Sequence, residues 1–348
     1  MDIIDKIIKK SNVKDQRTEE WLNYRKRRIG GSEMHFIERL NPNNIKTFIN
    51  DFIYNKIDRK KFYIFACQFG ILLENEIQEF SQVYHKCIIR NTGVLQNEII
   101  PHVCYSPDGL SLIDNKVILF EFKCPYSRIP NGFIPANYLS QLNTGLNTIR
   151  ECESAYYCEC EFKFCVFDDL FNYDKYNTSI HTIKKERNMG NLYESYGIIC
   201  LYADTDKNNI NNDNDFCIGD KTIFDSKVLK NIYNSKYRTC YFNELNINNL
   251  KHDNNLPYHD KKKLPTRQLI SDIKDIFNKH ISEKECFVKG YIYWKLYNYN
   301  TILKEKDYSY FDSNMIKKIL HVGNLLNIIN NDNKDVDECI EYVKKYIK

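Results

Sequence analysis

The sequence predicts a mixed α/β core that is interrupted by a long insertion, and two patterns carry this prediction. Apolar residues recur at helical spacing in several stretches, whereas Ala155–Phe167 alternates between apolar and polar residues, as a half-buried strand does. Residues 169–285 are instead rich in Asn, Asp and Lys and show few periodic elements. We therefore expect a core over residues 1–168, an insertion over 169–285, and a C-terminal strand and helices over 286–348 that complete the core.

The individual elements follow from spacing and from the residues at their ends. Residues 17–40 predict two helical pieces separated by Arg28–Ser32, with Ser32 as the N-cap of the second piece. Asp114-Asn115 predicts a turn that leads into a strand. Further helices are expected at 62–84, 137–149, 267–280, 313–329 and 335–347, and strands at 88–92, 99–105, 117–123, 155–167 and 286–297, with one more short periodic piece at 197–202.

Composition sets wide limits on function. The 348 residues contain 50 Lys and Arg against 46 Asp and Glu, a formal charge of +4 that permits a locally basic groove but does not require a nucleic-acid partner. The 13 cysteines are odd in number and irregularly spaced, which favours reduced thiols. The first ten residues lack an apolar signal core, and no stretch reaches the roughly 18 apolar residues of a membrane span. We expect a soluble intracellular protein that does not contact membranes.

The candidate catalytic residues lie at the end of an apolar strand. Residues Val117–Lys123 are apolar until they reach Glu121 and Lys123, which the strand period of two places on one face. Ser106-Pro107-Asp108-Gly109 forms a tight turn on the preceding hairpin arm, which would place Asp108 beside Glu121. Two acids and a backbone carbonyl suffice for Mg²⁺, which supports phosphodiester hydrolysis. The alternative is a surface hairpin with an exposed Glu/Lys pair.

Five stretches, in this order and spacing, resemble a known family. The chain looks like the lambda-type exonucleases (YqaJ-like viral recombinase nucleases) of the PD-(D/E)xK superfamily, most closely the versions carried by large nucleocytoplasmic DNA viruses such as the African swine fever virus group. The resemblance covers just under half of the chain, about residues 17–167. It rests on Trp21–Ser32, Phe69-Gly70 with Glu74, Ser106–Gly109, Glu121–Pro125, and Tyr138 with Gln141.

The resemblance implies a fold and a metal centre. The fold would be a restriction-endonuclease-like core, with a central mixed sheet flanked by helices. Asp108, Glu121 and the carbonyl of Phe122 resemble the metal ligands, for Mg²⁺ with Mn²⁺ as a substitute. Lys123 resembles the residue that orients or deprotonates the attacking water, and Glu74 matches a helix acid that reaches the metal directly or through water.

The resemblance also implies a pocket for a DNA 5′-phosphate, formed by Arg25, Ser32, Ser106 and Gln141. Arg27 and Arg28 would contact the DNA backbone or face water. The implied activity is 5′-to-3′ digestion of linear double-stranded DNA with a preference for 5′-phosphorylated ends, in viral recombination, repair or replication. Such an enzyme would have DNA ends as its substrate and a single-strand annealing protein as its partner. It would form a homo-oligomer, a trimer in some relatives, and would act in the cytoplasm of the infected host cell.

Three alternatives stay open. The same fold serves endonucleases and nickases, and a non-catalytic DNA-end-binding protein would keep the acids for structure only. The third alternative is an iron–sulfur nuclease, since Cys152, Cys158, Cys160 and Cys165 follow the Gln141 helix. Because Cys158 and Cys160 lie on the apolar face of the predicted strand, opposite Glu159 and Glu161, we expect buried thiols and no cluster.

Two further patterns have a structural and a functional interpretation. Lys261-Lys262-Lys263 with Arg267 is either a solvated loop or a DNA-backbone contact. The aromatic strand that contains Tyr291, Tyr293, Trp294, Tyr297 and Tyr299 predicts core packing and sheet-edge tyrosines in preference to base stacking.

Overall fold

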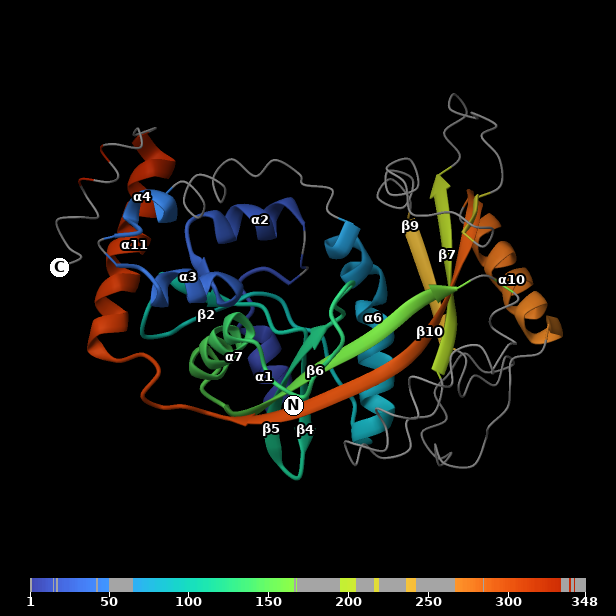
Figure 1. The fold of residues 1–348 in the computed structure, drawn as a ribbon, viewed down its shortest axis with the longest axis horizontal. Helices are drawn as coiled ribbons and strands as arrows, with labels where there is room; N and C mark the ends of the chain where they lie inside the picture. Colours follow the sequence, from blue (N-terminus) through green and yellow to red (C-terminus); the bar gives the residue numbers. More distant parts are fainter. Residues whose placement is uncertain are drawn as a thin grey trace.

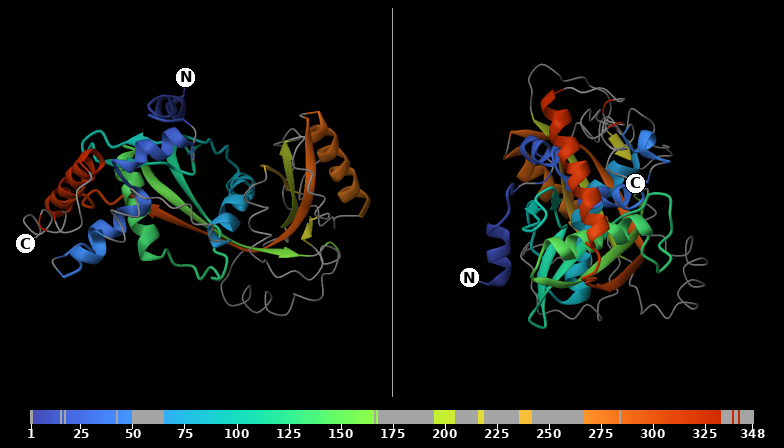
Figure 2. Two further views of the ribbon diagram at one scale, coloured as in Figure 1. Left: turned by 90° about the horizontal axis from the view of Figure 1, so that it is seen from above. Right: turned by 90° about the vertical axis from the view of Figure 1, so that its left-hand side faces the viewer.

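The computed structural model describes most of the chain, and the statements below refer to the described part, residues 2–14, 16, 18–41, 43–49, 65–165, 167, 195–204, 216–218, 236–241, 267–283, 285–332, 338 and 341. The molecule is elongated (Figures 1 and 2), because two long strands connect its two ends. These strands are β6 (Cys152–Cys165) and β10 (Cys286–Glu305), which pair antiparallel to each other.

A mixed sheet runs through the molecule. Its strand order is β4-β5-β6-β10-β7-β9, and only the β5–β6 neighbours along this order are parallel. A seventh strand, β8 (Phe216–Ile218), pairs parallel with β10. The remaining strands are β4 (Gly109–Ile113), β5 (Lys116–Lys123), β7 (Ser195–Asp204) and β9 (Lys236–Tyr241).

The turn between β4 and β5 agrees with the sequence. Asp114 and Asn115 adopt φ of 49° and 63°, the left-handed conformation that two-residue hairpin turns require and that Asp and Asn tolerate. This tight hairpin places Gly109 opposite Phe120, so that the segment just before Gly109 lies beside the end of β5.

Helices cover both faces of the sheet. On one face α6 (Phe65–His85) packs its apolar stripe against β5, β6 and β10, and on the other α7 (Ala136–Thr148) packs against β5 and β6. The far half of the sheet is covered by α10 (Arg267–Ser282). At the opposite end α11 (Ser313–Asp332) packs against α3 (Met34–Glu38), as Figure 1 shows. None of the helices in the described ranges is long and apolar enough to cross a membrane.

The N-terminal elements form a second layer beside the sheet. They are α1 (Ile3–Lys9), α2 (Glu19–Lys26), the short strand β1 (Ile29–Gly30), the 3₁₀ turn η1 (Gly31–Glu33) and, after α3, the helix α4 (Ile45–Phe48). The break predicted at Arg28–Ser32 is confirmed, but Ser32 is not an N-cap. It lies inside η1, and α3 begins only after Glu33, without a side-chain cap.

The predicted mixed α/β fold with a helix-flanked mixed sheet is confirmed, whereas one predicted strand is wrong and another is shorter than predicted. Residues 88–92 make only an isolated bridge between Arg90 and Leu110. The strand expected at 99–105 is reduced to β3 (Val103–Tyr105), because the chain turns at Ile100, where Val103 N donates to Ile100 O at 2.9 Å. This strand belongs to a small separate sheet of order β1-β3-β2, where β2 is Leu95–Gln96.

Strand β10 occupies the centre of the sheet and not its edge. Tyr293, Trp294 and Tyr299 are at most 4 % exposed, so core packing is confirmed for them, and the expected edge position is wrong. The Lys261–Lys263 run and most of the helix expected at 335–347 lie outside the described residues.

Candidate active site

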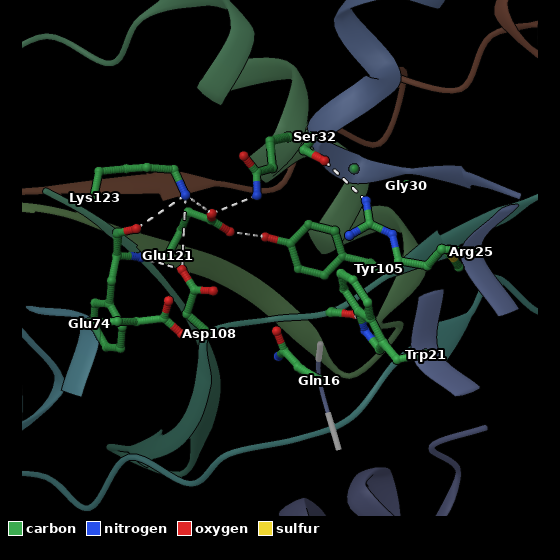
Figure 3. A pocket seen from close by; sticks show the side chains of 15 residues that line it. Gln16, Trp21, Arg25, Gly30, Ser32, Glu74, Tyr105, Asp108, Glu121 and Lys123 are labelled. Atoms are coloured by element: carbon green, nitrogen blue, oxygen red, sulfur yellow. Dashed lines mark hydrogen bonds and ion pairs between the residues drawn. The ribbon is translucent and has the colours of Figure 1, made fainter. Parts of the chain in front are cut away.

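A cavity of about 220 Å³ opens between α2, η1, α7, the middle of α6 and the carboxyl ends of β3 and β5. Figure 3 shows Lys123, Glu121 and Asp108 pointing toward one another, while Arg25 points toward Ser32 on the other side of Tyr105. The cavity contains nine of the residues predicted as site residues: Arg25, Ser32, Glu74, Ser106, Asp108, Glu121, Phe122, Lys123 and Gln141.

Oxygen atoms converge at one point of this cavity. Lys123 Nζ donates to Glu121 Oε1 and, at 3.1 Å, to the carbonyl oxygen of Phe122, and it lies 4.0 Å from Asp108 Oδ2. Asp108 also stabilises the local backbone. Its Oδ2 accepts a hydrogen bond from Phe122 N at 2.7 Å, which links the Asp108 turn to β5. The ammonium group thus occupies the place where a divalent cation would meet the same oxygens.

The donor set fits a hard cation that keeps part of its water shell. Carboxylates and a carbonyl are the ligands that Mg²⁺ prefers, and Mg²⁺ is held by one or two carboxylates more often than by a complete protein cage. Across the described parts of the chain, no group of three or more His, Cys, Asp or Glu is arranged to hold a metal. Glu74 lines the cavity on the side of Asp108 (Figure 3), without completing such a group of three acids among the described residues.

The Glu121 carboxylate is fully buried and is held by three donors. Tyr105 Oη donates to Oε2, while Lys123 Nζ and Gln141 Nε2, the latter at 2.6 Å, donate to Oε1. Gln141 therefore contacts the acid cluster as well as lining the cavity near Ser32. Each donor offsets part of the cost of removing this carboxylate from water.

Lys123 is a cation in this arrangement. Burial by itself lowers the pKa of Lys123, but the negative charges of Glu121 and Asp108 outweigh burial and raise its pKa above the usual value. The ring of Tyr138 lies 5.1 Å from Nζ and adds a cation–π contact. A protonated Lys123 can donate to a phosphate oxygen or orient a water molecule.

A second group of polar side chains forms the other end of the cavity. Arg25 Nη2 donates to Ser32 Oγ at 3.1 Å, and the guanidinium lies 4.5 Å from the Trp21 ring centroid. Trp21 Nε1 donates to Ser106 Oγ at 3.0 Å. A Cβ atom at Gly30 would lie 2.3 Å from Arg25 Nη2, so a larger residue there would displace this guanidinium. A cation with hydroxyl neighbours suits an oxyanion such as phosphate.

Two predicted contacts do not line the cavity. Arg27 is exposed. Arg28 lies just beyond α2 and turns back onto it, with its guanidinium 3.7 Å from the Tyr24 ring centroid and Nη1 donating to Tyr24 O at 3.0 Å.

Three residues of the site were given no role in the sequence interpretation: Gln16, Trp21 and Tyr105. Gln16 Nε2 donates to Pro107 O at 3.1 Å and supports the Asp108 turn. The sequence could have indicated Tyr105, because a tyrosine at the end of a buried strand needs a hydrogen-bond partner for its hydroxyl group.

The cysteines after α7 lie in the core. Cys152, Cys158 and Cys160 are fully buried free thiols, which confirms the packing predicted for them. Glu159, expected on the polar face of the strand, is also fully buried, because Arg128 and Tyr157 both donate to its Oε1.

One segment of this chain matches a known protein family. Residues 20–166 match the family model of the YqaJ-like viral recombinase domain. A curated protein of African swine fever virus, strain Badajoz 1971 Vero-adapted, is 23% identical over 192 residues, which is 48% of this chain and 55% of that protein. Its counterpart in the Tick/Malawi isolate of the same virus gives the same values. The chain spans about half the length of the curated relatives it matches.

Solved structures also show a partial likeness. An alkaline exonuclease (LHK-Exo) from Laribacter hongkongensis has a TM-score of 0.34 at 20% identity, and the match covers 41% of this chain and 74% of that chain. The same enzyme in complex with dAMP has a TM-score of 0.34 at 21% identity, over 41% of this chain and 73% of that chain.

Proposed function

We propose, from the premise that residues 20–166 carry a YqaJ-like viral recombinase domain, that the chain is a Mg²⁺-dependent deoxyribonuclease that digests linear double-stranded DNA from 5′-phosphorylated ends. The observation that carries the proposal is the cavity itself, which holds two chemically different ends. Asp108, Glu121 and Lys123 lie at one end, and Arg25 and Ser32 at the other. Cleavage next to a terminal phosphate needs both a centre that hydrolyses the phosphodiester bond and a site that binds the terminal phosphate.

Each of these cavity residues has its own proposed role in cleavage. When bound, Mg²⁺ supplies Lewis-acid polarisation of the scissile phosphate, and Asp108, Glu121 and the Phe122 carbonyl would hold it, with Glu74 acting through water. Lys123 donates from Nζ to a phosphate oxygen or to the attacking water.

The terminal phosphate would bind at the Arg25 end of the cavity. Arg25 Nη2 and Ser32 Oγ are already 3.1 Å apart and can both reach one oxyanion. Trp21 connects Arg25 and Ser106, because it stacks on the first and donates to the second. Gln141 lies between the two ends and contacts Glu121. Binding of the end would thereby set which phosphodiester bond is cleaved.

The proposed biological role follows from the DNA products of this reaction. Digestion of one strand leaves single-stranded 3′ tails, which suit viral recombination, repair or replication through a single-strand annealing protein. We further propose that the chain acts inside the infected cell, that Mn²⁺ substitutes for Mg²⁺, and that the enzyme works as a homo-oligomer. The basic side chains of Arg27 and Arg28 would lie near the DNA backbone.

Digestion of linear duplex DNA with and without a 5′-phosphate, in Mg²⁺, tests the proposal. We expect Lys123→Ala to lower the rate about 10²- to 10⁴-fold on either substrate. Arg25→Ala should lower the rate about 10- to 100-fold on the phosphorylated substrate and abolish the discrimination between the two. Arg39→Ala, an exposed arginine that does not line the cavity, is the matched control.

Two outcomes would contradict the proposal. If Lys123→Ala kept full activity, Lys123 would not belong to the catalytic centre. Cleavage of closed circular DNA at the same rate, with no effect of the 5′-phosphate or of Arg25→Ala, would identify an endonuclease on the same fold.

A further inference from the structure

Lys123 has two acidic neighbours on its face of the sheet. Glu121 lies two residues earlier on β5, and Glu159 is the register partner of Lys123 on the parallel strand β6. Residues two apart on a strand, and register partners on adjacent strands, point to the same face. Both carboxylates are fully buried, where a charge without a partner is unfavourable. Either acid could therefore attract the Lys123 ammonium group.

The ammonium group turns to only one of these acids. Lys123 Nζ donates to Glu121 Oε1 and, at 3.1 Å, to the Phe122 carbonyl, on the side of Asp108 (Figure 3). Among the described residues, its ion-pair partners are Glu121 and Asp108, and not Glu159. Strand register does not explain this choice, so the reason lies in what holds the Glu159 carboxylate.

Arg128 and Tyr157 hold the Glu159 carboxylate. Arg128 Nη2 donates to Glu159 Oε1, and Tyr157 Oη donates to the same oxygen at 3.0 Å. The Tyr157 ring lies 5.8 Å from the Tyr138 ring, which in turn lies 5.1 Å from Lys123 Nζ. Two aromatic rings thus connect the surroundings of Lys123 with those of Glu159.

Arg128 supplies the positive charge for Glu159. It comes from the segment between β5 and α7, and it is the ion-pair partner of Glu159 in the described part of the chain. Glu159 Oε2 is buried and has no hydrogen-bond partner among the described residues. Without Arg128, a buried carboxylate with an open oxygen would have no cation, which is strongly unfavourable. The cation that strand register places beside it is Lys123.

We propose that Arg128 is a positioning residue that neutralises Glu159 and thereby keeps Lys123 directed toward Glu121, Asp108 and the cavity. This inference deepens the proposed function and rests on it, because it presumes that Lys123 takes part in cleavage. Without Arg128, Glu159 would compete for the ammonium group, and Lys123 would reach a phosphate oxygen or the attacking water less often. Arg128 is not among the residues that line the cavity, so its effect passes through Glu159 and Lys123.

A double-mutant cycle on the full chain tests the proposal. Cleavage of linear duplex DNA in Mg²⁺ is measured for wild type, Arg128→Met, Glu159→Gln and the double variant, as a rate per folded molecule. We expect Arg128→Met to lower kcat about 10- to 100-fold with little change in KM, because a displaced catalytic group has an effect of this size. Glu159→Gln removes the competing charge, so kcat should stay near the wild-type value in this variant and recover to it in the double variant.

The cycle separates positioning from two simpler roles of Arg128. If Arg128 bound the DNA backbone, the double variant would remain as impaired as Arg128→Met, with a raised KM. If Arg128 only stabilised the fold, Arg128→Met would keep the wild-type kcat per folded molecule. Either result would overturn the proposal.

Three further variants complete the test. Arg128→Lys keeps the cation and should keep kcat near the wild-type value. Arg150→Met breaks an exposed ion pair with Glu98 and is the matched control, which should leave kcat unchanged. Arg128→Gln can still donate a hydrogen bond to Glu159 but carries no charge, and it replaces Arg128→Met throughout if that variant does not fold.

A crystal structure of Arg128→Met gives a readout that does not depend on cleavage. We expect Lys123 Nζ within hydrogen-bond distance of the Glu159 carboxylate. A Lys123 that keeps only its contacts with Glu121 and the Phe122 carbonyl would overturn the proposal.

The two proposals fail in distinguishable ways. A wild type that cleaves no DNA in Mg²⁺ contradicts the proposed function, whereas the crystal structure still reports whether Arg128 controls the position of Lys123. A wild type that cleaves DNA, with a folded Arg128→Met variant of unchanged kcat and unchanged Lys123 position, contradicts only the role of Arg128.

Discussion

The two faces of the sheet differ at the end of β5 and in the adjoining part of β6, where alternating residues of the same segments point to opposite sides. The face under α6 carries Phe120, Phe122, Cys158 and Cys160, all at most 5 % exposed and packed in one apolar cluster. The face under α7 carries Glu121, Lys123, Tyr157 and Glu159, and both of these glutamates are fully buried.

The charged face is satisfied internally. Glu121 accepts from Tyr105, Lys123 and Gln141, and Glu159 accepts from Arg128 and Tyr157. Removing such charges from water costs several kcal/mol per ion, and their mutual attraction only offsets this cost. The comparison teaches that the α6 face stabilises the sheet, while the α7 face contains groups that stability alone would not require.

The largest expected effect separates the two faces by function. Glu121→Gln removes a charge that the proposed cation needs, and we expect cleavage of linear DNA to fall about 10³-fold or more. The neighbouring residue on the other face, Phe120, provides the contrast, because Phe120→Ala should cost about 3–5 kcal/mol of unfolding free energy through the cavity that it leaves.

Urea denaturation together with the rate per folded molecule checks this pair. Phe120→Ala should keep the wild-type rate once the unfolded fraction is subtracted. A Phe120→Ala protein that is fully stable, or a Glu121→Gln protein that cleaves normally, would remove the contrast between the faces.

A smaller effect is expected from the second buried charge of the α7 face. Arg128 is 36% exposed and Glu159 is fully buried, so Arg128→Met leaves a buried carboxylate without its cation. We expect a loss of about 3 kcal/mol in unfolding free energy. The matched control is Arg150→Met, whose ion pair with Glu98 is exposed on both sides and should contribute less than about 1 kcal/mol. Equal losses in the two variants would show that burial of Glu159 is irrelevant.

The effect that is smallest near neutral pH concerns His85, the last residue of α6. Burial lowers the pKa of His85 to about 4, so His85 is neutral in the folded chain at neutral pH. The unfolded chain binds the proton near the usual pKa of about 6.5. Between these values the unfolded state binds more protons, and the stability that is fully present above about pH 6.5 is lost as the pH falls toward about 4.

Denaturation at several pH values, with His85→Gln beside wild type, isolates this effect. The slope that His85 adds is at most about 1.4 kcal/mol per pH unit in that window. His85→Gln should flatten the pH dependence, although it also loses contacts of His85 Nε2 with Tyr299 and Thr301. Parallel curves for the two proteins would mean that His85 titrates alike in the folded and unfolded chains.

Much of the candidate site could be predicted from local pattern. Strand alternation over Val117–Lys123 places Glu121 and Lys123 on one face, and the Asp114-Asn115 turn brings Asp108 back beside them. Both are short-range consequences of backbone geometry, which a few neighbouring residues determine.

What the tertiary structure alone decided involves residues far apart in the chain. The contact of Tyr105 with Glu121, the link from Gln141 to the same carboxylate, and the burial of Glu159 each need elements that pack from different parts of the sequence. The central position of β10 is of the same kind, because it pairs with β6 across more than a hundred intervening residues. By itself the sequence predicted nine of the residues that line the cavity. The packing of α7, η1 and β3 determined which side chains hold the Glu121 carboxylate, since contacts at a buried site depend on neighbours that periodicity does not specify.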